Sequence, residues 1–475
     1  RVIMDQIHIE ALKTIAGIKG ASDDQNIIKP HLVEPRNTFI GKTPLILFPN
    51  TVEMVSSLVM YCYDNNIKIV PQSGNTGLVG GNSPDKSGTQ IILNMKRMNR
   101  VREKDILNHT MTLESGVILA DAHNIAEEIK CHFPMHLASE GSAMIGGNIS
   151  SNAGGINVLQ YGVMRDLVLG LEVVLPNGNI WNGLTGLRKD NTGYDLKQLF
   201  IGSEGTLGVI TAATLKIFPQ HKQKNTAFVA IKNPEAAINL LRMAREISGD
   251  SLIAFEIMPR LGIEFNLKNM PGCQDPLVTK YDWYILMECA TSLDRDLLNL
   301  EVVMNKILEN AMETGLVLDG VIPKNINETR NLWNLREFMS EAQKFEGASI
   351  KHDISVPISK IPEFMRRGLE AVKEIIPNIR PVPFGHIGDG NLHFNFSQPV
   401  DMNKQDFLNN YSKINRTVHD IVVELGGSIS AEHGIGALKL EELEHYKTIT
   451  ELGLMRDIKH TLDCKNIMNP GRVIR

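Results

Sequence analysis

Two glycine-rich segments in the first half of the chain limit what it can fold into more than any other feature. Residues 71–82 read PQSGNTGLVGGN and directly follow residues 67–70, a short run that predicts a strand. Residues 140–155 read EGSAMIGGNISSNAGG. Glycine lets several backbone N–H groups approach one anion, because no Cβ stands in the way. One such segment would be an ordinary turn, whereas two predict a cradle that holds a diphosphate by backbone rather than by lysine.

Two familiar nucleotide-binding motifs are not found in this sequence. A nicotinamide-binding Rossmann fold requires G-x-G-x-x-G between a strand and a helix, and neither segment contains it. Gly41-Lys42-Thr43 matches the end of a phosphate-binding P-loop, but Arg36 stands where the first glycine of that motif belongs. We therefore expect a cofactor site of another type.

The composition is that of a globular protein with large cores. The 475 residues suffice for about three domains, and 43% of them are hydrophobic against 22% charged. The net charge of −5 argues against a dedicated nucleic-acid binder, because phosphate neutralisation needs a basic surface. We therefore expect no nucleic-acid partner.

Cysteine usage and hydropathy bear on the compartment. The five cysteines are scattered and odd in number, which argues against a disulfide framework and favours a reducing environment. No apolar run approaches the roughly 18 residues that a membrane-spanning helix needs. The sequence opens at Arg1 rather than Met, which leaves open the earlier removal of a targeting segment. The expected compartments are the bacterial cytoplasm, with or without peripheral membrane attachment, and the mitochondrial matrix.

Hydrophobic periodicity divides the chain near Pro219. Residues 1–43 show no clear period, which predicts a helical or irregular lead-in. Before Pro219 the pattern predicts strands at 45–48, 67–70, 91–94, 111–113, 167–175 and 207–217, with a helix over 52–62. After it, strands at 227–231, 284–287 and 347–354 alternate with helices at 234–247, 296–314 and 326–345, a pattern typical of an α+β domain. The last seventy or so residues return to helices, with a loop at 428–436 and a helix beginning near Ala437.

Residues 384–396, FGHIGDGNLHFNF, combine a glycine loop with an alternating segment. The alternation from Leu392 predicts a half-buried strand with His393 and Asn395 on one face, and His386 stands at the start of the preceding loop. Glu432 and His433 lie in the later loop. Two imidazoles and a carboxylate are a minimal site for Zn²⁺ or a similar divalent ion. The spacing alone leaves a metal site and hydrogen-bonded structural histidines equally open.

Basic side chains that could bind an acid precede this strand. Arg336 and Ser340 are four residues apart in a helix predicted over 331–344, and Lys351 lies in the strand predicted next. An arginine fork binds a carboxylate through two charged hydrogen bonds. Charge spacing alone favours surface ion pairs instead. Their partners would be Glu337 or Glu341 for the arginine and Asp353 for the lysine.

Three segments together resemble the FAD-binding half of the vanillyl-alcohol-oxidase-type flavoproteins. They are the loop PQSGNTGLVGG, the segment IGGNISSNAGG, and LRKDNTGYDLK at 187–197 followed by IGSEGTLGVIT at 201–211. Within this family the chain is most similar to the D-2-hydroxyglutarate dehydrogenases, with D-lactate dehydrogenases and the glycolate oxidase flavin subunit as near relatives. The resemblance runs from about Pro44 to residues 469–471.

The resemblance implies an α+β fold of several parts. A lead-in at 1–43 precedes a two-subdomain, PCMH-type FAD-binding domain at 44–220. A ferredoxin-like antiparallel-sheet substrate domain at 221–425 and a helical segment at 426–475, which returns to the FAD site, complete the chain. Asn75 stands about where some relatives attach the flavin through histidine, so FAD is expected to be non-covalent. The family's FAD contacts carry over to Gly74, Asn75, Thr76, Gly77, Gly81, Ser142, Gly146, Asn148, Ser151, Gly155, Ile210 and Asn469.

The resemblance also implies the chemistry. His386, His393 and Glu432 match metal ligands and His433 a catalytic base, while Arg336, Ser340 and Lys351 match dicarboxylate contacts, with Asn395 as an additional one. The family pattern has Thr where Ser340 stands. The metal would polarise the alcohol, His433 would take its proton, and hydride would pass to flavin N5.

The expected reaction is oxidation of D-2-hydroxyglutarate to 2-oxoglutarate. The alternatives are a D-lactate dehydrogenase, a glycolate oxidase flavin subunit and, more distantly, a flavin-free metallohydrolase. Without a nicotinamide motif, electrons would leave to an electron-transfer flavoprotein, a quinone or a cytochrome. A homodimer is left open.

Overall fold

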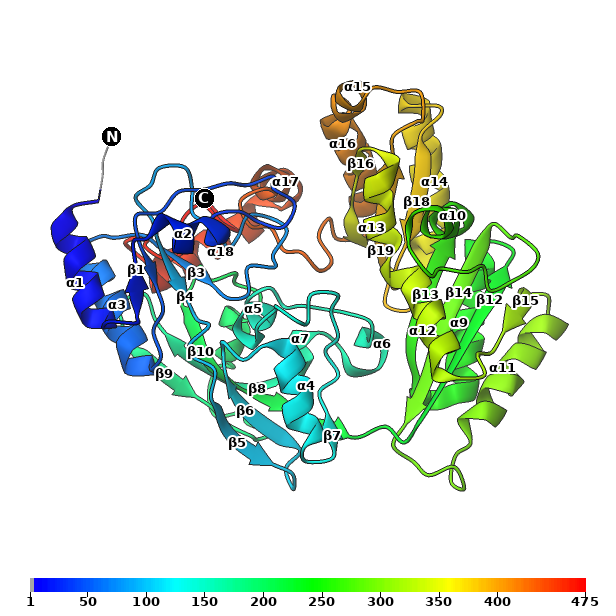
Figure 1. Cartoon of the computed structure of the whole chain (residues 1–475), viewed down its shortest axis with the longest axis horizontal. Helices are drawn as coiled ribbons and strands as arrows, with labels where there is room; N and C mark the ends of the chain where they lie inside the picture. The colour runs from blue at the N-terminus through cyan, green and yellow to red at the C-terminus, as the bar shows by residue number, and fades with distance from the viewer. Residues whose placement is uncertain (1–3) are drawn as a thin grey trace. The chain divides into compact units, whose positions relative to one another are not determined.

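The computed structural model describes residues 4–475, and the chain forms two compact units (Figure 1). The first unit comprises the chain up to Gly155 together with Gly162–Gln220 and Glu432–Arg475. The second comprises Ile156–Tyr161 and His221–Ala431. Each unit combines helices with β-sheets, so the predicted mixture of α and β structure is confirmed.

The first sheet of the first unit shares one core with two helices. Its strand order is β1-β2-β4-β3, and β4 runs parallel to both β2 and β3. Leu12 and Leu58 pack in the same core as Leu93, and Met468 from the far end of the chain joins them. The strands are β1 (Ala21–Ser22), β2 (Ile46–Leu47), β3 (Ile69–Gln72) and β4 (Ile91–Asn94), and the helices are α1 (Gln6–Ala16) and α3 (Val52–Asp64).

A five-stranded antiparallel sheet forms the rest of this unit. Its order is β5-β6-β10-β8-β9, and its three central strands occupy the positions predicted for strands. The strands are β5 (Val101–Asp105), β6 (Thr110–Glu114), β8 (Val168–Val174), β9 (Ile180–Gly183) and β10 (Val209–Lys216), with a separate pair, β7 (Cys131–His132) and β11 (Phe218–Pro219). The other helices are α2 (Gln25–Ile28), η1 (Lys29–His31), α4 (Leu119–Glu127), α5 (Ile145–Ser150), α7 (Met164–Leu167), α8 (Lys197–Phe200), α17 (Leu440–Tyr446) and α18 (Ile449–Leu462).

The second unit contains two antiparallel sheets. One has the order β13-β14-β12-β15, and in the other β19 lies between β18 on one side and β16 with β17 on the other. The strands are β12 (Gln223–Ile231), β13 (Leu252–Pro259), β14 (Trp283–Thr291), β15 (Val317–Val321), β16 (Ser349–Ile350), β17 (Asp353–Ser355), β18 (Arg380–Phe384) and β19 (Asn391–Ser397). A bridge between Ile257 and Gly385 joins the two sheets. This bridge brings the neighbours of Ile257 in the chain close to the neighbours of Gly385.

Helices complete the second unit. They are α6 (Val158–Tyr161), α9 (Pro234–Ser248), η2 (Gly249–Ser251), α10 (Arg260–Asn269), α11 (Leu300–Glu313), α12 (Ile326–Glu337), α13 (Met339–Ala342), η3 (Gln343–Glu346), η4 (Ile358–Lys360), α14 (Ile361–Ile375), α15 (Lys404–Leu408) and α16 (Tyr411–Glu424).

The helix predicted over 326–345, which would hold Arg336 and Ser340 on one face, is wrong at its middle. α12 ends at Glu337, because Phe338 has ψ −7° and turns the next peptide out of the helical direction. Ser340 therefore lies on a separate short helix, α13. The C-terminal helix predicted from Ala437 also begins later, at Leu440.

The two strands predicted beside the histidines also differ in detail. β19 is buried on both faces rather than half-buried, with only His393 partly exposed. The strand predicted over 347–354 is interrupted after Ile350, where the His352 N–H donates to the side-chain Oδ1 of Asn395 (3.3 Å) rather than to a backbone oxygen. Its two halves, β16 and β17, nevertheless keep one register against β19.

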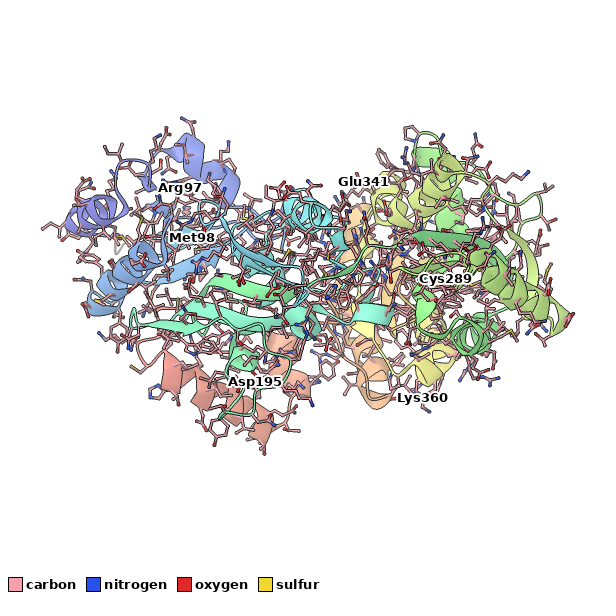
Figure 2. The ribbon with its side chains drawn as sticks, turned by 90° about the horizontal axis from the view of Figure 1, so that it is seen from below. Arg97, Met98, Asp195, Cys289, Glu341 and Lys360 are labelled. Atoms are coloured by element: carbon pink, nitrogen blue, oxygen red, sulfur yellow. The ribbon has the colours of Figure 1, made fainter. Side chains whose placement is uncertain are left out.

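The cysteines and the helices bear on what the sequence led us to expect for thiols and for membrane-spanning segments. All five cysteines are free thiols, and Cys289, labelled on β14 in Figure 2, is buried. Within residues 4–475, none of the helices combines the length and the apolar character that crossing a bilayer demands.

Candidate active site

The two glycine-rich segments touch each other through their backbones. A Cβ on Gly74 would lie 2.1 Å from the carbonyl oxygen of Ser142, so only glycine allows this approach. The second segment contains α5, which packs against β10, the strand that carries the buried Ile210. Gly146 and Asn148 lie in α5. The fold thus joins segments that are distant in sequence into one continuous backbone surface.

Buried polar atoms at this surface have no protein partner among the described residues. They include Oδ1 of Asn148, Oδ1 of Asn469 and Oγ of Ser115. Both asparagines are almost completely buried. Because buried polar groups are nearly always hydrogen-bonded, these atoms fit a polar ligand such as FAD.

Asn469 connects the C-terminal end of the chain to the first glycine-rich segment. Its Nδ2 donates to the carbonyl oxygen of Gly81 (2.8 Å) and to that of Glu204 (2.7 Å). Its neighbour Met468 pairs with Ile69 through a parallel bridge. The last residues of the chain therefore belong to the site formed near its beginning.

Other predicted FAD contacts use their side chains within the protein. Asn75 Nδ2 donates to the carbonyl oxygen of Val33 (3.0 Å), and its Oδ1 accepts from Asn82 Nδ2 (2.9 Å). Ser151 Oγ donates to the carbonyl oxygen of Gly147 (2.9 Å). These side chains hold the shape of the two segments. Thr76, Gly77 and Gly155 lie in the loops of the same segments.

The loop that carries His433 is held by Glu204. Its carboxylate accepts from the backbone N–H groups of Ile435 and Gly436, each at 2.7 Å. Desolvation raises the pKa of the Glu204 carboxyl group, although the N–H groups of Ile435 and Gly436 oppose this shift. Glu204 was not among the predicted functional residues, although it lies within the motif IGSEGTLG that carried part of the resemblance.

The two predicted histidine ligands lie together in the second unit. Their ring centroids are 5.7 Å apart, with His386 after β18 and His393 within β19. The second unit ends at Ala431, whose N–H donates to the carbonyl oxygen of Asp353, and Glu432 is the next residue in the chain. The potential ligand atoms of His386, His393 and Glu432 all lie within 4.8 Å of one another.

A second group at this place includes a residue that sequence reasoning did not assign to a metal. The potential ligand atoms of Asp353, Glu432 and His433 also lie within 4.8 Å of one another. Asp353 is buried on β17, and its Oδ1 accepts from Asn391 Nδ2 (3.0 Å). The arrangement therefore offers nitrogen and oxygen donors that suit a divalent ion.

Glu256 joins the histidine pair to Arg336. Its Oε1 accepts from His386 Nδ1 (2.7 Å), and its Oε2 accepts from Arg336 Nε (2.6 Å). Burial alone would raise the pKa of Glu256, but His386 and Arg336 hold it at about 2. Because the carboxylate occupies Nδ1, Nε2 is the His386 nitrogen suited to bind a cation. Glu256 has no sequence signal, and backbone contacts of β13, including the bridge between Ile257 and Gly385, bring it here.

Arg336 is buried beside the same imidazoles. Its guanidinium lies 4.9 Å above the ring of Phe384, whose centroid is 5.2 Å from that of His393. The surface ion pair considered for Arg336 is replaced by the buried pair with Glu256, since Glu341 binds Lys344 instead. Because the ion pair with Glu256 uses Nε of Arg336, its Nη1 and Nη2 are the nitrogens that could bind a substrate carboxylate.

Lys351 and Ser340 form a second polar contact. Lys351 Nζ donates to Ser340 Oγ (2.9 Å) and to the Ser340 carbonyl oxygen (3.2 Å). Asn395, the additional predicted substrate contact, is already used within the protein. Its Nδ2 donates to Gln343 Oε1 (3.0 Å), and its Oδ1 accepts from the His352 N–H.

Two solved enzyme structures share the fold of this chain. p-Cresol methylhydroxylase with substrate bound aligns with a TM-score of 0.74 at 16% identity, covering 98% of this chain and 96% of that one. Alkyldihydroxyacetonephosphate synthase aligns with a TM-score of 0.75 at 16% identity, covering 98% and 85%. The chain therefore shares its fold with these two enzymes over nearly its whole length.

The sequence comparisons give the family. Residues 220–473 match the model described as "FAD linked oxidases, C-terminal domain", and residues 43–183 match "FAD binding domain". The chain belongs to the FAD-linked oxidase family. FAD binding is thereby supported, and the flavin-free metallohydrolase is set aside.

Curated relatives cover nearly the whole chain. The mitochondrial D-2-hydroxyglutarate dehydrogenase of Danio rerio is 38% identical over 454 residues, which covers 95% of this chain and 82% of the relative. That of Arabidopsis thaliana is 36% identical over 471 residues, covering 99% and 82%. A putative mitochondrial D-lactate dehydrogenase of Schizosaccharomyces pombe is 34% identical over 484 residues, covering 98% and 90%.

Proposed function

We propose that this protein is an FAD-dependent dehydrogenase that oxidises D-2-hydroxyglutarate to 2-oxoglutarate. The observation that carries the proposal is Glu256, which bonds both Arg336 and His386. The Arg336 guanidinium, which can bind a carboxylate, is thereby held next to His386, a potential metal ligand. A 2-hydroxy acid carries its carboxylate and its hydroxyl on adjacent carbons. Its carboxylate would therefore match Arg336, and its hydroxyl would match a metal held by His386.

The metal site in this proposal is formed by His386, His393 and Glu432, and Zn²⁺ suits their donors. A divalent ion bound there would polarise the substrate hydroxyl and lower its pKa. Glu256 would fix the tautomer and orientation of His386, as carboxylates do for histidine ligands in metalloproteins.

His433 is the proposed base that takes the hydroxyl proton. A neutral imidazole has a pKa near ~6.5 and accepts a proton at neutral pH. Glu204 would position it by fixing the loop that follows, through the N–H groups of Ile435 and Gly436.

The first unit is proposed as the two-subdomain FAD-binding domain, and the second as the ferredoxin-like substrate domain. FAD supplies a hydride acceptor, and Asn75 gives no histidine for covalent attachment. The buried Oδ1 atoms of Asn148 and Asn469 support the cofactor's placement at the glycine-rich segments. The proposed contacts are the residues carried over from the family.

Recognition of a second carboxylate separates D-2-hydroxyglutarate from D-lactate. Arg336 is proposed to bind one carboxylate, and Lys351 with Ser340 the other. The Schizosaccharomyces pombe relative supports D-lactate as the alternative substrate, in which case the Lys351 contact would have no carboxylate to bind. The two substrates therefore predict different roles for Lys351.

Replacing Lys351 tests this assignment. We expect Lys351→Met to lower kcat/KM for D-2-hydroxyglutarate about ten- to a hundredfold, because a charged hydrogen bond contributes about 1.5–3 kcal/mol. D-Lactate turnover with the same dye acceptor should change less than threefold. Lys360→Met, at an exposed lysine of the same unit labelled in Figure 2, is the matched control. A preference for D-lactate that Lys351→Met leaves unaltered would refute the dicarboxylate proposal.

The acceptor and the compartment complete the proposal. An electron-transfer flavoprotein, a quinone or a cytochrome would reoxidise the flavin. Several relatives are named mitochondrial, which supports the mitochondrial matrix over the bacterial cytoplasm. A homodimer is compatible with this chemistry.

A further inference from the structure

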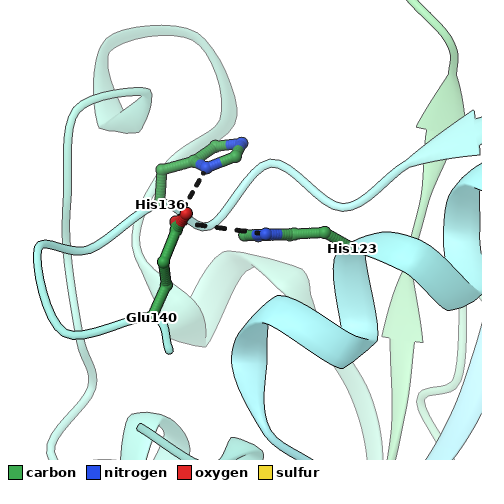
Figure 3. A group of neighbouring side chains, drawn as sticks. All are labelled: His123, His136 and Glu140. Carbon is green, nitrogen blue, oxygen red and sulfur yellow. Dashed lines mark hydrogen bonds and ion pairs between the residues drawn. The ribbon is translucent and has the colours of Figure 1, made fainter. Parts of the chain in front are cut away.

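A second cluster of potential metal ligands lies in the first unit (Figure 3). His123 lies on α4, and His136 and Glu140 belong to the segment between β7 and α5. Glu140 Oε2 is 3.1 Å from His136 Nδ1 and 4.0 Å from His123 Nδ1. Both imidazoles therefore direct the same ring nitrogen toward one carboxylate oxygen.

The tautomer of His123 is fixed by the backbone. Its Nε2 lies 2.6 Å from the carbonyl oxygen of Met135. A carbonyl oxygen only accepts hydrogen bonds, so Nε2 carries the proton and Nδ1 of the neutral ring carries the lone pair. Metal-bound histidines typically donate their other ring N–H to such a partner.

The ring geometry argues against two protonated histidines. The His123 and His136 rings are stacked, with centroids 4.2 Å apart and an angle of 29°. Burial, followed by repulsion from His136, lowers the pKa of His123. An ion pair between His136 and Glu140 would explain why these two side chains lie close together. It would not explain why the lone pair of His123 Nδ1 also approaches the Glu140 carboxylate.

We propose that His123, His136 and Glu140 form a second binding site for a divalent transition-metal cation such as Zn²⁺. Two imidazole nitrogens and one carboxylate oxygen suit Zn²⁺ and similar ions. The side chain of His123 is 13% exposed and those of the other two are 41% exposed, so water can complete the coordination. This donor set is separate from His386 and His393, which lie in the other unit.

The proposed ion would fasten α4 to the second glycine-rich segment. Leu119 and Ala120 of α4 already donate their N–H groups to the carbonyl oxygens of Ala143 (2.8 Å) and Glu140 (3.0 Å). The carbonyl oxygen of His136 lies against Gly155, where a Cβ would come within 2.0 Å of it. Ordering this segment should help it hold FAD, so metal binding and FAD retention should reinforce each other.

Zinc stoichiometry of the flavin-loaded protein tests the proposal. The protein is stripped with chelator, dialysed against Zn²⁺ and measured by mass spectrometry of the metal content, with His460→Gln, at an exposed histidine of α18, as control. We expect His136→Gln to bind one zinc fewer per chain than wild type, and the control to match wild type. The double variant with His393→Asn should bind less than either single variant.

The outcomes separate this site from the active site. A loss of zinc in His136→Gln but not in His393→Asn supports the second metal site and refutes the proposed metal site at His386, His393 and Glu432. An unchanged zinc content in His136→Gln overturns the second site, whatever His393→Asn does. Should His136→Gln fail to retain its flavin or to fold, Glu140→Gln, at a surface side chain, replaces it. Zinc should then raise the melting temperature of the His393→Asn protein but not that of the variant carrying both Glu140→Gln and His393→Asn.

Discussion

At the scale of single residues, one buried carboxylate organises the candidate active site. Glu256 is 1% exposed and bonds two groups that come from different elements, α12 and the loop after β18. Breaking a buried ion pair by removing one partner leaves the other charge without compensation. The histidines could be predicted from the local pattern GHIGDGNLHF. Glu256 could not, because nothing near it in the sequence records its contact with His386.

Glu256→Gln tests this role. An amide keeps the shape but loses the charge, so Arg336 would remain buried without a counter-ion, and we expect the free energy of unfolding to fall by about 3 kcal/mol. Zinc affinity should fall at least tenfold, since outer partners of histidine ligands contribute this much. Urea unfolding and zinc titration measure both effects. Glu341→Gln, at an exposed glutamate of α13 labelled in Figure 2, should match wild type, and the same behaviour in Glu256→Gln would contradict the account.

At the scale of secondary structure, β19 followed from local pattern, whereas the strand β13, which carries Glu256, and the interruptions of two other elements did not. β19 was predictable because Leu392, Phe394 and Phe396 alternate with polar residues. The end of α12 at Phe338 was not, since residues 326–345 keep helical spacing throughout and only the backbone angles of Phe338 break it. The break after Ile350 likewise depends on Asn395, a side chain on another strand.

Elements of the second unit are tied together by Glu346. It lies on η3 and binds Lys268 of α10 (2.7 Å) and Arg380 of β18 (2.8 Å), which hold the pKa of its carboxyl group at about 2 although burial opposes this. Because the pKa is lower in the folded chain than its ordinary value, the carboxylate stabilises the fold above about pH 4.5 and ceases to do so as the pH falls toward 2.

Glu346→Gln should therefore lower the free energy of unfolding by about 2 kcal/mol at pH 7. The difference from wild type should shrink steadily between pH 5 and about pH 3. Urea unfolding across this range measures it, with Glu370→Gln on the exposed face of α14 as control. A difference that stays constant with pH would show that the ion pairs are not its cause.

At the scale of the whole molecule, residues 432–475 return to the first unit after the chain has formed the second. Met468 pairs with Ile69, and Lys459 Nζ donates to the carbonyl oxygens of Thr206 and Met468, each at 2.7 Å. Local patterns carry no sign of this return. The resemblance to the flavoprotein family indicated it, because the family motif extends to Asn469.

Asn469→Gly tests the contribution of this return to cofactor binding. Asn469 has φ 44°, so glycine keeps the backbone while removing the amide that contacts Gly81 and Glu204. We expect the Kd for FAD to rise about tenfold, because this change corresponds to the free energy of one to two hydrogen bonds. Fluorescence of released flavin measures it. Asn239→Ala, at an exposed position of α9, is the control, and equal FAD affinity in the two variants would contradict the placement of FAD at Asn469.

The most direct test of the central claim is anaerobic reduction of the bound flavin by hydroxy acids. D-2-Hydroxyglutarate should bleach the flavin absorbance rapidly, D-lactate more slowly, and the L-enantiomers not at all. Removing the divalent ion with chelator should slow the bleaching, and restoring Zn²⁺ should recover it. A flavin that D-2-hydroxyglutarate leaves oxidised would contradict the proposed function.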